Sequence, residues 1–414
     1  MEKIKTNYIL LFFTFIYLNY VTFKFSIMGS YLVIYGIPIF FLLTNFVQSR
    51  IIISKRMLHV MYLLFIMVAM SFLWPIVFGT YDFGYLYVIF NMLKRYIIFL
   101  FVFLMIKKIY GVNMTVEHFM YYYAMSTVLY VIVTVVFTII PDIKCFWFNL
   151  IYIAPNNLRL MNSYGYNMRI GFSGFSGYRK TIMCTLSILF LTHIQWSTGS
   201  RFRINKKNYV GMVFLCLLGN MFYGRIGVAI SVVALCFALV LYKKITIHNC
   251  FVICCIMSVF VGLYKVGKGM LIFKDWISWL TIPFINLFVM GDFNNGSVNT
   301  LNQMLFLPNW KIILFGMGIM ANDYSSGNYL LGNDSGVMRN IIYWGIGGTV
   351  VAYALLYNSL KIVKWKDYVF EFLLLCCILV FEIKGDMYYE IVALSLACST
   401  MIRKKHDKEY EEKI

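Results

Sequence analysis

Apolar stretches long enough to cross a lipid bilayer recur from one end of this chain to the other. A transmembrane helix needs roughly twenty mostly apolar residues. Hydrophobic residues make up 61% of the 414 positions, whereas charged residues make up 13%. So small a share of polar residues does not cover a water-soluble fold of this size. The sequence therefore predicts an all-α, polytopic integral membrane protein.

The pattern of hydropathy predicts about twelve transmembrane helices in a single transmembrane domain over residues 1–414. They are expected near residues 7–23, 29–47, 58–78, 87–106, 118–140, 179–196, 209–223, 226–242, 250–267, 339–360, 368–382 and 387–402. No small-residue cleavage pattern follows the first of them, so we expect a retained helix and not a secretory signal. Two connections are long, about 141–178 and about 268–338, and we expect the function to lie there.

Basic residues gather in alternate short connections and account for most of the net charge of +19. If the amino terminus is cytoplasmic, every predicted inside connection is basic, in agreement with the positive-inside rule. We therefore expect both termini in the cytoplasm and the two long loops outside it. Membrane topology explains the positive charge better than a nucleic-acid partner does.

Three predicted helices that run inward from the outer face begin beside basic residues. These residues are Arg179 and Lys180 in the sixth helix, Arg225 in the eighth and Arg339 in the tenth. A helix amino terminus carries unpaired N–H groups and partial positive charge, and a guanidinium binds phosphate in a bidentate way. The pattern predicts an anion site, most naturally for phosphate. The alternatives are contacts with lipid headgroups or pairing with a nearby acid.

The first long loop contains the segment MRIGFSGFSGYRK, in which Arg169 precedes three glycines. Arg159, Tyr164 and Tyr178 lie in or beside the same segment. Glycine lets a backbone approach a ligand closely, and tyrosine rings offer faces on which sugar rings rest. The segment is a candidate substrate-binding loop, although tyrosine is also common in loops at a membrane interface.

Asp334 stands directly before the predicted tenth helix and has two interpretations. It caps the helix, the commoner role for aspartate there, or it accepts a proton from an attacking sugar hydroxyl. Asp323 is a further candidate for substrate binding, without a local motif. Lys94 and Arg95 interrupt the fourth apolar stretch, and they line an entrance for substrate unless the helix begins after them.

The sequence contains no motif for metal binding or for redox chemistry. The ten cysteines form no CxxC pair, and nine of them fall in apolar stretches. No DxD motif is present, and every histidine maps to a predicted cytoplasmic end or to the tail. We expect no cofactor, no metal and no histidine base on the outer face.

Several local motifs resemble those of the Wzy polymerases of O-antigen and capsule, within the O-antigen polymerase and ligase superfamily. They are RIGFSGF at Arg169 to Phe175, the Gly224-Arg225 turn, and a succession of Pro308, ILFGMGI, LGNDSG and Arg339 before an apolar helix. SGYRK stands where the family often has a Pro-Asn pair. Ligases of the superfamily typically use a histidine in the large outer loop, so the histidine placement favours a polymerase.

The resemblance implies a GT-C-like, metal-independent membrane glycosyltransferase in the bacterial cytoplasmic (inner) membrane. It would transfer a growing glycan from one undecaprenyl pyrophosphate carrier to the sugar of an incoming lipid-linked unit. By motif, Arg169, Arg225 and Arg339 would contact the pyrophosphates. The resemblance also implies lipid partners and a protein that regulates chain length.

Three rival functions remain open at this stage. A flippase for lipid-linked oligosaccharide would also have about twelve helices, but it predicts evenly short loops. An O-antigen ligase would join finished glycan to another acceptor. A non-catalytic membrane scaffold would tolerate replacement of its outer arginines.

Overall fold

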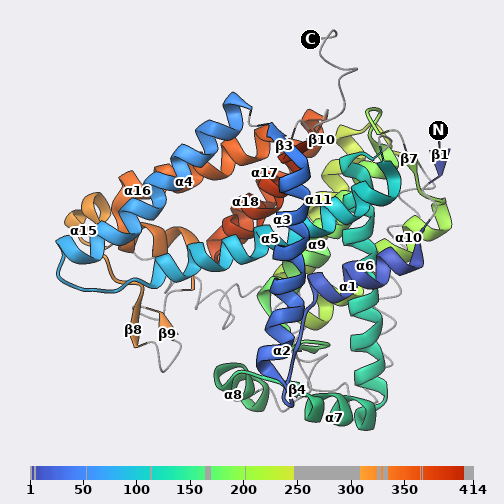
Figure 1. Ribbon diagram of the computed structural model, residues 1–414, viewed down its shortest axis with the longest axis horizontal. Helices are drawn as coiled ribbons and strands as arrows, with labels where there is room; N and C mark the ends of the chain where they lie inside the picture. Colours follow the sequence, from blue (N-terminus) through green and yellow to red (C-terminus); the bar gives the residue numbers. More distant parts are fainter. Residues whose placement is uncertain are drawn as a thin grey trace, which may run out of the picture. The chain divides into compact units, whose positions relative to one another are not determined.

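The computed structural model is a mostly helical fold (Figure 1). It describes residues 2–3, 6–52, 54–111, 114–163, 169–200, 202–246, 308–323, 328–329, 334–363, 365 and 367–404. The predicted helix at 250–267 and most of the loop at 268–338 lie outside these residues, as does Tyr164.

The helices of the first half are α1 (Tyr8–Leu18), α2 (Ile27–Tyr31), the π-helical η1 (Leu32–Gly36), α3 (Ile37–Gln48), α4 (Lys55–Val77), α5 (Gly84–Tyr110), α6 (Val116–Ile139), α7 (Pro141–Leu150), α8 (Pro155–Ser163) and α9 (Tyr178–Trp196). Those of the second half are α10 (Lys206–Tyr223), α11 (Arg225–Leu241), α15 (Trp310–Phe315), α16 (Gly336–Ile362), α17 (Tyr368–Lys384) and α18 (Tyr388–Ser399).

The strands are short. They are β1 (Glu2–Lys3), β2 (Thr22–Phe23), β3 (Ser49–Ile52), β4 (Ile151–Tyr152), β5 (Ile170–Gly171), β6 (Gly174–Phe175), β7 (Phe202–Arg203), β8 (Ala321–Asp323), β9 (Asn328–Tyr329) and β10 (Met401–Lys404). β1 pairs in parallel with β7, whereas β3 with β10, β5 with β6 and β8 with β9 pair antiparallel.

Five of the described helical segments are long and apolar enough to cross a membrane. They are Ile27–Phe46, Lys55–Val77, Gly84–Tyr110, Val116–Ile139 and Gly336–Ile362. Shorter apolar helices occur at Tyr8–Leu18, Ile226–Leu241 and Tyr388–Ser399. These apolar helices indicate a helical membrane protein, while the count of twelve spans stays a prediction.

The helix positions follow the hydropathy pattern closely in the described residues. α4, α6 and α9 lie within a few residues of their predicted bounds, and α1 is shorter, since it ends at Leu18. α5 begins at Gly84, so Lys94 and Arg95 lie inside it and not before its start. There the Lys94 ammonium lies 4.5 Å from the centre of the Phe90 ring. Cation–π contact of this kind lowers the cost of a charge at an apolar helix face.

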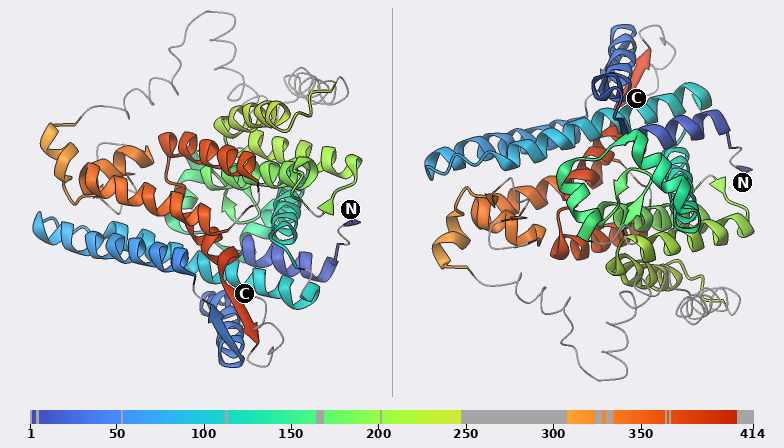
Figure 2. Two further views of the ribbon diagram at one scale, coloured as in Figure 1. Left: turned by 90° about the horizontal axis from the view of Figure 1, so that it is seen from above. Right: turned by 90° about the horizontal axis from the view of Figure 1, so that it is seen from below.

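The chain divides into two compact units with interleaved segments. Unit 1 consists of Met1–Phe15, Met120–Phe306 and Lys366–Lys384, and unit 2 of Ile16–Phe119, Leu307–Trp365 and Gly385–Ile414. In unit 1, α9, α10 and α11 pack side by side, the green to olive helices of Figure 2. In unit 2, α16 packs along α4 and α18 packs along α5 (Figure 1).

Side-chain hydrogen bonds join the ends of helices within each unit. In unit 1, Tyr178 at the start of α9 donates a hydrogen bond to the carbonyl of Phe381 near the end of α17, and His193 near the end of α9 lies beside Asp367 before the start of α17, so these two helices are antiparallel. In unit 2, the Tyr85 hydroxyl near the start of α5 donates to Asn340 Oδ1 near the start of α16. The predicted alternation of helix directions across a membrane stays a prediction.

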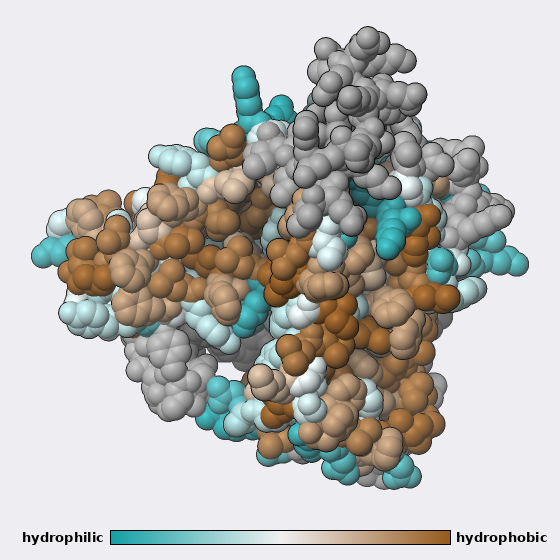
Figure 3. All heavy atoms as spheres, viewed as in Figure 1, coloured by the Kyte–Doolittle hydropathy of each residue, from teal (hydrophilic) through white to brown (hydrophobic). Residues whose placement is uncertain are grey.

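α4 exposes a continuous apolar surface, which Figure 3 shows as brown side chains over this helix. Its exposed large side chains are Leu58, Met61, Tyr62, Phe65, Val68, Phe72, Leu73, Ile76 and Val77. From Met61 to Val77 the exposed positions are all apolar, which is typical of a helix that faces lipid.

α16 is interrupted at Gly345, whose φ of 70° lies in the left-handed region. The interruption leaves carbonyl groups of α16 without their usual helical partners. Met317 N donates to Ile342 O at 2.7 Å, and Gly318 N donates to Tyr343 O at 3.0 Å. The Phe315-Gly316-Met317-Gly318 motif of the sequence therefore satisfies the backbone at a break in α16.

Candidate functional site

In unit 1, Arg169 begins a tight hairpin formed by β5 and β6. Its φ of 56° is unusual for a residue with a side chain. Ser176 N donates to Arg169 O at 2.6 Å and closes the hairpin, and Gly174 takes a φ of 88° at the turn. The half-buried Arg169 is therefore held by an ordered loop, and its predicted role in substrate binding stays a prediction.

Tyr130 on α6 holds this hairpin in place through hydrogen bonds of its hydroxyl group. Its hydroxyl makes hydrogen bonds with the hydroxyls of Ser173, at 2.8 Å, and Ser176. It also accepts a bond from Ser173 N at 3.2 Å. A Cβ on Gly171 would lie 2.7 Å from the Tyr130 hydroxyl oxygen, so close packing explains this glycine. Gly171 thus serves the contact with α6, whereas Gly174 packs against Ile153.

The first turn of α9 adds a second group of basic residues to the hairpin. Gly177 precedes the helix, and Tyr178, Arg179 and Lys180 follow it. Lys180 is 6% exposed, and its ammonium lies 3.9 Å from the centre of the Tyr130 ring. The ring of Tyr130 thus contacts the Lys180 ammonium of α9, and its hydroxyl bonds the hairpin. The same side chain therefore holds both the hairpin and the first turn of α9.

The turn between α10 and α11 packs on the same turn of α9. Gly224 and Gly227 leave a notch for the side chain of Thr181, because a Cβ on Gly224 would lie 2.6 Å from Thr181 Oγ1. Gly224 has an extended backbone with a φ of −175°, so its close approach to Thr181, and not its conformation, calls for glycine. Arg225 is the first residue of α11, and its backbone therefore lies beside the start of α9.

Unit 1 thus brings three predicted basic segments into one neighbourhood. The hairpin of Arg169, the first turn of α9 and the Gly224-Arg225 turn are linked through Tyr130 and Thr181. The amino termini of α9 and α11 lie here, so partial positive charge of two helices adds to the side-chain charge. This arrangement suits an anion. We call it the basic cluster.

In unit 2, the start of α16 differs from the prediction for Asp334. Ser335 caps the helix, because its side chain accepts a hydrogen bond from Met338 N. Asp334 is exposed directly before it. Serine and aspartate compete for the same capping position, and the neighbouring serine takes it here. Asp334 therefore does not cap α16 through its side chain.

Arg339 forms an ion pair with Asp386, the residue in the short connection between α17 and α18. The distance from Arg339 Nη2 to Asp386 Oδ2 is 2.6 Å, and the side chains are 6% and 14% exposed. Pairing with a nearby acid was the alternative to an anion site for these arginines. Sequence reasoning missed Asp386, although an acid in a very short connection between two apolar helices is a usable signal.

Aromatic and amide side chains lie in the same part of unit 2 as this ion pair. The Tyr85 hydroxyl donates to Asn340 Oδ1 at 2.8 Å, and the Tyr85 and Trp344 rings lie 4.1 Å apart. Tyr388 and Tyr389 follow Asp386 after one intervening residue, Met387, and their rings lie 3.8 Å apart. We call Arg339, Asp386, Asn340 and these aromatic residues the acidic site, after its carboxylate. Aromatic rings beside amide and carboxylate groups are typical of sugar-binding sites.

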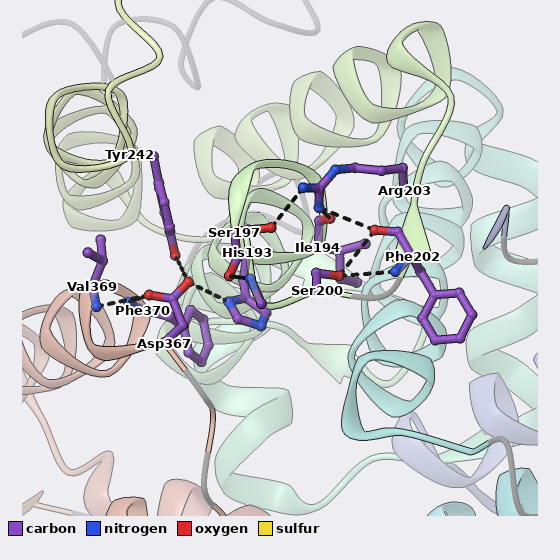
Figure 4. Close-up of polar contacts among 11 residues, drawn as sticks. His193, Ile194, Ser197, Ser200, Phe202, Arg203, Tyr242, Asp367, Val369 and Phe370 are labelled. Carbon is purple, nitrogen blue, oxygen red and sulfur yellow. Dashed lines mark hydrogen bonds and ion pairs between the residues drawn. The ribbon is translucent and has the colours of Figure 1, made fainter. Parts of the chain in front are cut away.

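A second polar cluster of unit 1, shown in Figure 4, joins the other ends of its helices. Asp367 Oδ2 accepts a hydrogen bond from the Tyr242 hydroxyl at 2.8 Å and lies 3.3 Å from His193 Nδ1. Asp367 Oδ1 caps α17 by accepting from the amides of Val369 and Phe370. We call these residues the Asp367 cluster. The sequence did not predict this cluster, because its residues are far apart in the chain.

The environment lowers the pKa of Asp367. Burial alone would raise the pKa of this carboxyl, but hydrogen bonds from His193, Ser197 and Tyr242, with the Phe370 amide, together bring it below its usual range. Asp367 is therefore ionised at neutral pH. A charge that is tied to α9, α11 and the start of α17 serves to hold these helices together.

Arg159 is exposed on α8, and Arg179 is half-buried in the first turn of α9, within the basic cluster. For Arg225 and for Asp323, which ends β8, the structure describes the backbone only. Arg169, Lys180 and Arg225 belong to unit 1 and Arg339 to unit 2, so their joint action on one substrate stays a prediction.

No protein-family model matches this sequence, and a search of curated proteins found no match either.

Proposed function

We propose that this protein polymerises lipid-linked oligosaccharide repeat units at the extracytoplasmic face of a bacterial cytoplasmic membrane. The donor is a growing glycan on undecaprenyl pyrophosphate, and the acceptor is a sugar hydroxyl of an incoming lipid-linked unit. The product is O-antigen or capsular polysaccharide. The reaction is a glycosyl transfer that needs no metal, in line with the Wzy resemblance of the motifs.

The observation that carries this proposal is the basic cluster of unit 1. Two helix amino termini and a glycine-rich hairpin bring Arg169, Lys180 and Arg225 into one neighbourhood. Such a site favours a diphosphate over a neutral ligand. During the transfer, negative charge develops on the leaving diphosphate, and fixed positive groups lower the energy of that transition state.

Arg169, Arg225 and Arg339 are the arginines that we propose to contact diphosphate. Lys180 is buried under Tyr130, so its proposed role is to raise the local positive potential from behind the hairpin. Membrane lipid solvates the apolar helices and the lipid tails of both carriers. A protein that regulates chain length is a proposed partner through the resemblance alone.

The test uses purified protein in lipid vesicles with a defined lipid-linked repeat unit. A ladder of extended products supports the polymerase. Movement of unaltered substrate across the bilayer would support a flippase, and transfer of finished glycan to another acceptor would support a ligase. A protein that does none of these would be a scaffold.

The variant Arg225→Ala tests the basic cluster within that assay. We expect normal insertion and a loss of chain extension of at least about 100-fold, as for removal of one group that stabilises developing charge. Lys207→Ala is the matched control, because it also removes one positive charge but lies exposed in the first turn of α10. Normal chain lengths from Arg225→Ala would remove Arg225 from the mechanism.

A further inference from the structure

The acidic site of unit 2 contains a carboxylate oxygen with an unused hydrogen-bonding capacity. Asp386 Oδ2 holds Arg339, whereas Oδ1 is buried and makes no hydrogen bond with the described residues. Leaving a buried acceptor without a donor costs about 1–3 kcal/mol. Proteins tolerate such a cost chiefly where a ligand or water supplies the missing donor.

Two buried donors of the same region also lack a partner among the described residues. They are Nδ2 of Asn340 and Nε1 of Trp344, one helical turn apart on α16. Asn340 is fixed through its oxygen by Tyr85, which leaves its amide hydrogens for another group. One acceptor and two donors beside aromatic rings match a ligand that both donates and accepts, as sugar hydroxyls do.

We infer that Asp386 is the general base of the proposed transfer, receiving through Oδ1 the proton of the acceptor sugar hydroxyl. This inference rests on the proposed function and replaces Asp334 in the basic role. Asp334 is exposed before α16, whereas Asp386 is enclosed beside Arg339, a proposed diphosphate contact. The hydroxyl would thus meet its base close to the leaving group.

The transfer is balanced in atoms and charge. The hydroxyl oxygen of the acceptor forms a bond to C1 of the donor sugar, while the bond from C1 to the diphosphate oxygen breaks. The electron pair of that bond leaves with the diphosphate, whose added negative charge the arginines stabilise. The hydroxyl proton passes to Asp386, which becomes neutral, and no metal or redox partner takes part.

Several titratable groups face Asp386 and tune its basicity. Arg339 contributes from α16, Tyr388 and Tyr389 follow on α18, and Tyr85 approaches Tyr389 from α5. Burial raises the pKa of the Asp386 carboxyl, and the Arg339 guanidinium opposes that rise. A raised pKa makes a carboxylate a better proton acceptor at neutral pH.

The test is the rate of chain extension, against pH, of the purified protein with the defined repeat unit. We expect the wild-type rate to fall at acidic pH as the base becomes protonated, and Asp386→Asn to lose about 100-fold or more at every pH. Asp142→Asn is the matched control, with the same change at an exposed aspartate in the first turn of α7, and should keep the wild-type rate and pH profile.

A structural role is separated from proton transfer by Asp386→Glu. This variant keeps the charge that pairs with Arg339 but moves the carboxylate by one methylene. We expect normal thermal stability, a reduced rate and a displaced acidic limb of the pH profile. A wild-type rate from Asp386→Asn or from Asp386→Glu, with an unchanged acidic limb, would overturn the inference alone. No extension by the wild-type protein would overturn the proposed function, and this inference with it.

Discussion

Replacing Gly224 by alanine should force α11 away from α9. The added Cβ would lie 2.6 Å from Thr181 Oγ1 and 3.4 Å from Thr181 Cβ and Cγ2. Alanine adopts the φ of −175° without strain, so the clash is the whole cost in the folded state. Overpacking of this kind costs about 1–3 kcal/mol. Loss of chain entropy in the unfolded state offsets about 0.4–1 kcal/mol, which leaves a net destabilisation of about 1–2 kcal/mol.

Thr181→Ala should restore most of this loss. It removes Oγ1 and Cγ2 and leaves only Cβ at 3.4 Å, an ordinary contact. Thr181 Oγ1 is buried and has no hydrogen-bond partner among the described residues, so its removal breaks no bond that the structure contains there. The two substitutions should therefore couple, with an interaction free energy of about 1–2 kcal/mol in favour of the double variant.

The assay is a double-mutant cycle of unfolding free energies in mixed detergent micelles, with chain extension measured in parallel. Gly211→Ala is the matched control, because it lies inside α10 and no heavy atom lies within 4 Å of the added Cβ. It should be neutral or stabilising, since alanine favours a helix over glycine. Equal stability of Gly224→Ala and Gly211→Ala, or additive effects of Gly224→Ala and Thr181→Ala, would refute the notch as the feature that positions Arg225.

Two further predictions concern buried charge. Hydrogen bonds lower the pKa of folded Asp367, so its stabilisation is complete above about pH 4, the unfolded value, and is lost as pH falls through the lowered value. The Asp367→Asn variant should therefore be less stable than wild type at neutral pH. Between about pH 4 and pH 2 its melting temperature should fall by less than that of the wild-type protein. Arg339→Met leaves Asp386 uncompensated and should cost about 3–5 kcal/mol, whereas Arg339→Met with Asp386→Leu should fold normally. Yields and melting temperatures in detergent measure both, and a double variant as unstable as the single one would contradict the ion-pair argument.

The helices could be predicted from the sequence because each apolar stretch carries its own signal. α4, α6 and α9 follow from local hydropathy, which depends on neighbouring residues only. The shorter α1 and the break in α16 were missed. At the break the backbone of Gly345 packs against Leu314 and Phe315, and no local pattern reports such a contact between distant segments.

The basic cluster was predictable in its residues but not in its geometry. Glycine and arginine in short turns indicated Arg169 and Arg225 as site residues. Nothing in the sequence indicated that Tyr130 on α6 joins the hairpin to Lys180. The partners of Arg339 and His193 were also missed. Asp386 and Asp367 each lie in a connection between apolar helices, and only the fold brings them to those partners.

The break at Gly345 divides α16 into two parts with different roles. The part before it carries Arg339, Asn340 and Trp344, and the part after it is largely apolar. Non-helical backbone at membrane depth requires partners from protein, and the carbonyls freed here accept bonds from Met317 and Gly318. The first part is thereby fixed by backbone bonds as well as by the Arg339–Asp386 pair. Because both supports act on one short helical segment, loss of the ion pair alone should shift the acidic site without unfolding the apolar part of α16.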